Sequence, residues 1–314
     1  MTETKENGEV PQYLTFAIKG GAQLGLRKTI SRSIKGQYMN TRMKKAIAAS
    51  GLVSLAAVLI STAALAQEVA RTPSGKPDLS GIWQAMTSAH YNVEPHAAAE
   101  GPHSDVMGAL SAIPGSLGVV EGGRIPYNEQ GLRQRDANRI DAIDKDPLTK
   151  CYMPGVPRAN ALPFPFQIVQ SQEVILIAYE FAEANRILYV DQPEIESQVD
   201  AWMGHSNAHW EGDTLVVRVT GQMPDTWFDR AGNHHSWEMV VEERYTPMGP
   251  NHIDYSATIT DPNTFTAPWT ISFPLYRHLE ENMQLLEFKC AEFSEEYLYG
   301  QYRKPGTPKG NPKD

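Results

Sequence analysis

The stretch "WMGHSNAHWEGD" holds the densest set of residues that could do chemistry. His205 and His209 are four residues apart and are flanked by Trp202 and Trp210. On a helix, two histidines at this spacing would bind zinc well, but the surrounding glycine, serine and asparagine favour a strand. On a strand the two imidazoles share one face at a separation of about 13 Å. One metal ion cannot bridge that distance without a bend or bulge, so we expect no metal site.

Proton transfer is one reaction that nearby residues could perform. His205 follows a glycine, and His235 lies at the entrance of a β-like segment that contains Glu243. Glu243 falls on the more apolar face of that segment, so in a closed barrel it would face inward, where burial can tune a carboxyl group for acid or base work. Imidazole is the commonest general acid or base. His205, His235 and Glu243 are therefore the candidate catalytic residues.

Aromatic and polar side chains in the same segments could hold a flat ligand. The candidate ligand-binding residues are Trp202, Ser206, His209, Trp210, Trp237, Tyr255, Trp269 and Tyr276. Ser206 is not expected to be a nucleophile, because no G-x-S-x-G elbow surrounds it. Tryptophans that only fill a core would give the same pattern, so both interpretations stay open.

These residues must be positioned by strands, because an alternating pattern of apolar and polar residues runs through the second half of the chain. After a short strand at 78–84, the expected strands are 166–170, 173–181, 186–191, 202–210, 214–221, 236–246, 252–260, 268–277 and 284–292. Short polar links such as "EGD" predict hairpins. Closing such a meander removes its exposed edges. We therefore predict a mainly β fold, an antiparallel up-and-down barrel of about 8–10 strands with an irregular, partly helical N-terminal extension.

The predicted domain organisation places the barrel core at 166–295. Residues 67–165 are expected to supply a lead-in strand, long loops and a short helix, predicted over 129–144, that wrap the barrel or cap one mouth. Residues 296–314 form a polar C-terminal tail.

The segment 43–66 has the features of a secretory signal peptide. Lys44 and Lys45 precede an apolar stretch, and Ala-Leu-Ala at 64–66 fits the cleavage rule. A transmembrane anchor is the alternative, since about 20 apolar residues can span a bilayer. We expect cleavage, no stable membrane insertion afterwards, and a periplasmic or secreted protein. Residues 1–42 are expected to be a non-native or disordered extension before the true start at Met43.

Charge and motifs narrow the partners. Residues 67–314 contain 19 Lys and Arg against 34 Asp and Glu, a balance that argues against nucleic acid or anionic membrane as a partner. No P-loop and no G-x-G-x-x-G after a strand is present, so no cofactor is predicted.

The two cysteines, Cys151 and Cys290, are an even count in a chain expected to be exported. An oxidising compartment favours a disulfide between them over two free buried thiols.

Several motifs together resemble a large group of exported, lipocalin-like bacterial proteins of unassigned function. They are "DLSGIW", "CYMPGVPR", "PFQIVQ", "GHSNAHWEGDTLVV", "VEERY" and "DPNTFTAPWT". The resemblance covers about residues 70–295 and implies export and a β-barrel, but no reaction. Many members of the group carry Gly in place of Ala208 and Arg in place of His209, so any role of His209 would be particular to this branch.

Three functions fit these observations. The first is a periplasmic barrel that binds a small apolar or aromatic molecule in its cavity. The second is a cofactor-free acid-base enzyme, of lyase, isomerase or hydrolase type, in the same cavity. The third is a structural envelope protein without a ligand.

Overall fold

The computed structural model describes residues 68–101, 104–140, 142–194, 199–299 and 301. The predicted signal peptide at 43–66, the preceding residues 1–42 and most of the predicted tail at 296–314 lie outside this part of the chain. Among the residues described, no helix is both long and apolar enough to cross a membrane.

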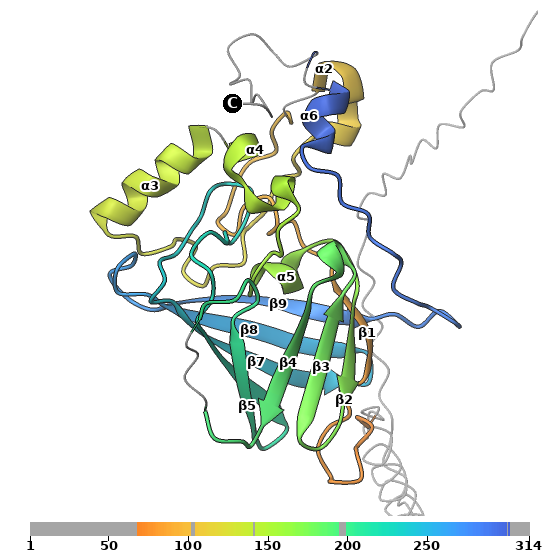
Figure 1. Cartoon of the computed structure of the whole chain (residues 1–314). Coiled ribbons are helices and arrows are strands. Elements are labelled where there is room, and N and C mark those ends of the chain that lie inside the picture. The colour runs from red at the N-terminus through yellow and green to blue at the C-terminus, as the bar shows by residue number, and fades with distance from the viewer. Residues whose placement is uncertain (1–67, 102–103, 141, 195–198, 300, 302–314) are drawn as a thin grey trace, which may run out of the picture. The chain divides into compact units, whose positions relative to one another are not determined.

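Nine strands in the described part of the chain close into one barrel in sequence order, so the predicted lipocalin-like barrel is confirmed (Figure 1). The strands are β1 (Gly81–Ala85), β2 (Phe166–Gln170), β3 (Val174–Tyr179), β4 (Asn185–Val190), β5 (His205–Glu211), β6 (Thr214–Thr220), β7 (Val240–Gly249), β8 (His252–Thr260) and β9 (Trp269–Arg277). β1 pairs with both β2 and β9, and the second pairing completes the closure.

The helices lie between the strands or after the last one, and most of them are short. They are α2 (Ser104–Met107), η1 (Gly108–Ser111), α3 (Glu129–Ile140), α4 (Ala142–Lys145), η2 (Pro147–Lys150), α5 (Arg158–Ala161), η3 (Phe181–Glu183) and α6 (Ser294–Tyr299), where η marks a 3-10 helix. The predicted helix over 129–144 is thus divided into α3 and α4.

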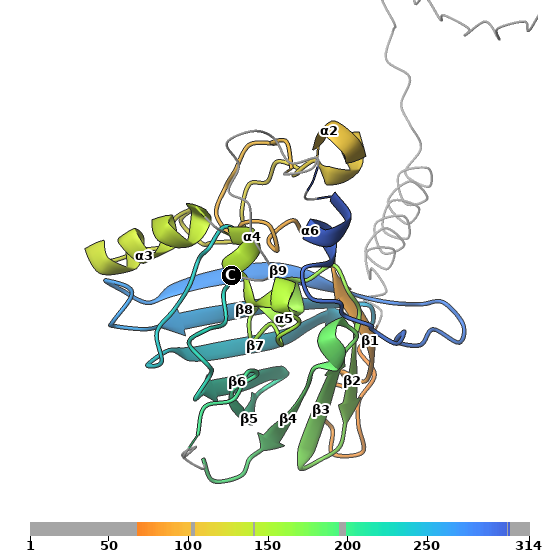
Figure 2. The ribbon, with the colours of Figure 1, turned by 45° about the horizontal axis from the view of Figure 1, so that its top comes forward.

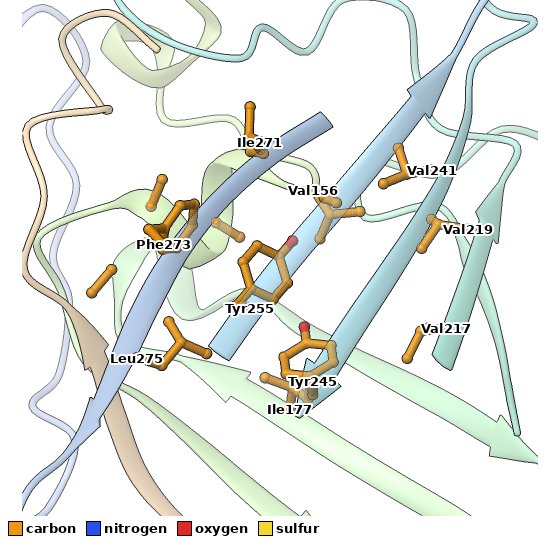
Figure 3. Close-up of a cluster of buried hydrophobic side chains, with 14 of the residues drawn as sticks. Val156, Ile177, Val217, Val219, Val241, Tyr245, Tyr255, Ile271, Phe273 and Leu275 are labelled. Carbon is orange, nitrogen blue, oxygen red and sulfur yellow. The ribbon is translucent and has the colours of Figure 1, made fainter. Parts of the chain in front are cut away.

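The alternation of side chains along the strands builds the core. In β8, Ile253, Tyr255, Ala257 and Ile259 are buried, whereas the residues between them are exposed or partly exposed. Valine, isoleucine, leucine and aromatic side chains of β7, β8 and β9 all point into the same interior (Figure 3). Because side chains of a strand point alternately to its two faces, a period of two in the sequence suffices to predict this arrangement.

The prediction that all strands are antiparallel is wrong for one pair. β4 and β5 are parallel, with Leu188 opposite Ser206 and Val190 opposite Ala208. Hairpins cannot produce parallel neighbours. β5 instead begins at the end of the barrel where β4 began, so the two strands run in the same direction.

One predicted strand is absent, and two others begin later than predicted. Residues 284–292 form no strand, because β9 pairs with β1 and closure leaves no free edge for another strand. Trp237 lies before β7 rather than on it, and its side chain is 63% exposed. Trp202 likewise lies before β5.

The two mouths of the barrel are closed differently, one by a short helix and the other by a pair of side chains. At one mouth α5 enters the barrel and its four residues are all buried (Figure 2). The buried Arg158 of α5 forms a two-pronged ion pair with Asp146, at 2.7 and 2.8 Å. At the other mouth the guanidinium of Arg277 lies 4.2 Å from the ring centre of Trp83 and donates to the Ser80 carbonyl.

The predicted disulfide between Cys151 and Cys290 is confirmed. The Cα atoms of the two residues are 5.7 Å apart, and the bond closes a loop of 139 residues. It ties the end of η2 to the segment that follows the last strand.

Candidate functional site

A buried ion pair lies inside the barrel. Glu243 of β7 is fully buried, and its Oε2 accepts a hydrogen bond from Nη2 of Arg186 on β4 at 2.5 Å. Its Oε1 accepts from the hydroxyls of Tyr245 at 3.0 Å and Tyr255 at 2.9 Å, and from the amide of Asn160 at 3.2 Å. The inward orientation of Glu243 predicted from the alternation is thus what the structure shows.

α5 adds Asn160 to this set, because the helix places its side chain inside the mouth of the barrel. The Tyr179 hydroxyl donates to Oδ1 of Asn160 at 2.8 Å, and Asn160 donates in turn to Tyr245 at 2.8 Å. We refer to Asn160, Tyr179, Arg186, Glu243, Tyr245 and Tyr255 as the Glu243 cluster.

Burial and charge determine the ionisation of the tyrosines and the arginine in the Glu243 cluster. Burial, reinforced by the Glu243 carboxylate, raises the pKa of Tyr245 and Tyr255 well above the usual value, so both hydroxyls keep their protons and donate. Burial acts to lower the pKa of Arg186, but the Glu243 carboxyl group together with Tyr179 and Tyr245 outweighs it, and the pKa is raised. Arg186 is therefore a charged guanidinium inside the barrel, and the hydrogen bond to Glu243 gives this buried charge an acidic partner.

Arg186 is a charged residue of this cluster that sequence reasoning missed. It shares the inward face of β4 with Leu188 and Val190. An arginine in register with two buried apolar residues is the signal that could have found it, because a charge at such a position needs a buried partner.

A cavity of about 580 Å³ opens outside the barrel strands. Its walls come from α3, from the segment 145–152, from Trp202 and from the connection between β6 and β7 at 224–235. We call it the Trp202 cavity. Figure 1 shows α3, α4 and this connection gathered at the same end of the barrel.

Aromatic rings give the Trp202 cavity a flat wall. The rings of Tyr152 and Trp202 stack, with centres 4.5 Å apart and planes 11° from parallel. Trp227, which is largely buried, and the paired histidines His234 and His235 contribute to the lining. Such a surface suits the face of an aromatic ligand.

His235 is held in one neutral form. Its Nδ1 lies 2.8 Å from the Ser236 carbonyl, which can only accept, so Nδ1 carries the proton. Nε2 then accepts from the Thr226 hydroxyl at 2.7 Å. Burial lowers the pKa of His235 to about 4, so the imidazole is a neutral part of the cavity wall at physiological pH.

The other histidine candidates lie on the outside of β5. Ser206 and Ala208 are the buried residues of this strand, and His205 and His209 are on the opposite face, as the even spacing predicts. His205 Nε2 lies 3.1 Å from the Val199 carbonyl, and His209 Nε2 lies 3.2 Å from a Glu211 carboxylate oxygen. Neither histidine lines the Trp202 cavity.

Gly204 explains the local geometry of "GHS". Its φ of +63° is in the left-handed region, and a Cβ at this position would lie 2.6 Å from Cγ1 of Val219. The chain at Gly204 therefore lies too close to β6 to accept a side chain. This close approach serves the packing of β5 on β6.

The three candidate catalytic residues have separate environments. His235 lies in the Trp202 cavity, Glu243 in its buried cluster and His205 on the outer face of β5. No hydrogen bond joins any two of them in the described part of the chain.

The remaining candidate ligand-binding residues are dispersed. Trp269 is a core residue in edge contact with Phe228 and Phe265, and Tyr255 belongs to the Glu243 cluster. Trp210 packs against the core, and Tyr276 contacts His252 near the surface.

Lys145, Lys150, Tyr152 and Trp227 line the Trp202 cavity but were not among the residues singled out from the sequence. No spacing could have signalled them, because the walls come from segments as far apart as 134 and 235. As for metals, the described residues contain no group of three or more His, Cys, Asp or Glu side chains that could hold an ion.

Comparison with models of protein families, with curated proteins and with solved structures finds no match to this chain.

Proposed function

We propose that this protein binds a small aromatic molecule in the Trp202 cavity. The observation that carries the proposal is the stacked pair of Tyr152 and Trp202 on the wall of a cavity of about 580 Å³. This volume falls within the range of about 300–1,000 Å³ that is typical of small-molecule sites. Two residues selected from the sequence, Trp202 and His235, contribute to the site.

The proposal moves the ligand from the barrel interior to its helical end. The interior positions on the strands are filled by core side chains and the Glu243 cluster. The Trp202 cavity, in contrast, opens between α3, η2 and the loop from β6 to β7, segments that lie outside the barrel strands.

Binding is favoured over acid-base catalysis by the placement of the candidate residues. Catalysis by His205, His235 and Glu243 would require them to converge on one substrate. Each instead has its own hydrogen-bond partners.

We further propose that the protein works in the periplasm or outside the cell, as a member of the exported lipocalin-like group that its motifs resemble. The disulfide between Cys151 and Cys290 supports this proposal, because such bonds persist in oxidising compartments.

Isothermal titration of the purified protein with 2-naphthamide, a neutral flat probe, tests the binding site. Trp202→Ala should weaken binding about tenfold or more, because it removes half of the aromatic wall. Trp237→Ala is the matched control, since Trp237 is exposed and does not line the cavity.

The proposal is overturned if neither 2-naphthamide nor 2-naphthoate binds the wild-type protein. It is also overturned if Trp202→Ala and Trp237→Ala bind the probe as the wild type does. Mass spectrometry of small molecules released from the freshly purified protein would then identify what the natural ligand is.

A further inference from the structure

The distribution of lysines in this protein is uneven. The described residues contain four lysines, Lys76, Lys145, Lys150 and Lys289. Two of them, Lys145 and Lys150, line the Trp202 cavity. This concentration stands out because residues 67–314 carry 34 acidic against 19 basic residues.

The charge balance of the cavity wall is positive. Asp225 is its acidic lining residue, against the two lysines. His235 does not alter this balance at neutral pH, because burial lowers its pKa to about 4. A concave site lined by one sign of charge concentrates ligands of the opposite sign.

Lys150 is the better placed of the two lysines. It is partly buried and lines the cavity. Lys145 is exposed and already donates to the Ala137 carbonyl at 3.1 Å. Lys150 also lies two residues before Tyr152, so the cation and the aromatic wall come from the same short segment.

We infer that the ligand of the Trp202 cavity is an aromatic carboxylate, with its ring against Tyr152 and Trp202 and its carboxylate paired with Lys150. This inference rests on the proposed function. An ammonium and a carboxylate form a charge-assisted hydrogen bond, which is stronger than one between neutral groups and is strengthened further where water is partly excluded. The ring supplies affinity and the carboxylate supplies selection between ligands of similar shape.

Three probes of one shape test the inference by isothermal titration. They are 2-naphthoate, an anion at neutral pH, the neutral 2-naphthamide, and the cationic 2-naphthylmethylamine. We expect the wild type to bind 2-naphthoate about tenfold more tightly than 2-naphthamide. Raising the salt concentration should narrow that ratio, because salt screens a partly exposed ion pair.

Lys150→Gln should bring the ratio of the two affinities close to one, by weakening the binding of 2-naphthoate more than that of 2-naphthamide. Lys289→Gln is the matched control, because Lys289 is an exposed lysine that does not line the cavity. Asp225→Asn should raise the affinity for 2-naphthoate by removing the one acidic lining residue.

The outcomes separate the two claims. If 2-naphthamide binds in a Trp202-dependent way but 2-naphthoate binds no more tightly, the site stands and the inferred ligand class is wrong. The same holds if the amine binds tightest, or if Lys150→Gln leaves the ratio at its wild-type value. If no probe binds, the proposed function itself fails.

Discussion

At the scale of single residues, the protein contains two kinds of polar site with different physical characters. The Glu243 cluster is buried, and the two carboxyl oxygens of Glu243 accept four hydrogen bonds from neighbouring side chains. The Trp202 cavity is open and carries polar groups that a ligand can reach. The two sites differ in burial. A buried charge needs a partner within the protein, whereas a charge on the wall of an open cavity can be paired by a ligand.

Breaking the buried ion pair should be costly. Arg186→Met leaves the Glu243 carboxylate without its counter-ion, and we expect the free energy of unfolding to fall by about 3–5 kcal/mol. Adding Glu243→Gln to this variant should cost much less than the sum of the two single changes, because the double variant has no unpaired buried charge. Urea denaturation of the two single variants and the double variant measures this coupling.

Arg244→Met is the matched control for that experiment. Arg244 pairs with Glu211 at 2.6 Å on the surface, where an ion pair contributes about 0–1 kcal/mol. Additive effects of Arg186→Met and Glu243→Gln would show that the two side chains do not stabilise each other.

At the scale of elements, the cavity depends on a short helix that is anchored from a distance. η2 ends at Lys150, and the next residue, Cys151, has a left-handed φ of 62° and forms the disulfide to Cys290. The cysteine therefore lies between two residues of the cavity wall, Lys150 and Tyr152. The disulfide thus adds a covalent link at the end of η2, whose first turn is already held by the ion pair of Asp146 with Arg158.

Removing the disulfide should therefore affect both stability and binding. In the chain-entropy model a loop of this length contributes about 4–5 kcal/mol, and Cys151→Ala with Cys290→Ala should lose roughly that amount in urea denaturation. We also expect the affinity for 2-naphthamide to fall, under conditions where the circular dichroism of the variant shows a folded barrel. Unchanged affinity in the folded variant would show that η2 holds its place without the link.

At the scale of the whole molecule, buried titratable groups make stability depend on pH. Burial lowers the pKa of His90 and His235 to about 4, and burial raises the pKa of Asp229 to about 6. Each histidine contributes stability that is present above pH 6.5 and is lost as the pH falls through about 4. Asp229 acts in the opposite sense, since its contribution is present below pH 3.8 and is lost as the pH rises through about 6.

The two histidines outweigh the aspartate between pH 6 and pH 4. We expect the free energy of unfolding to fall with decreasing pH, by about 1.4 kcal/mol per pH unit from these three groups. His235→Gln should reduce the measured slope by about that amount. His252→Gln, which removes an imidazole from the surface, is the control, and an equal slope in the His235 variant and the wild type would contradict the expected burial effect.

The features that could be predicted from the sequence are those set by residues close together in the chain. Period-two alternation is a property of neighbouring residues, so the strands from 166 to 277 and the inward face of Glu243 could be inferred from the sequence. The hairpin at "EGD" could also be inferred, because its turn needs only a glycine with positive φ, here Gly212 at 60°. The disulfide followed from an even cysteine count, with no alternative partners to choose among.

Other features were decided only in three dimensions. The parallel pairing of β4 with β5 is a contact between two separate strands that no local pattern records, and the closing of β1 on β9 left no place for the strand expected at 284–292. Arg186 and Glu243 are 57 residues apart and meet only because the barrel closes. The Trp202 cavity likewise depends on the tertiary structure. Its walls come from segments far apart in the sequence, and no local pattern predicts where such segments leave a space between them.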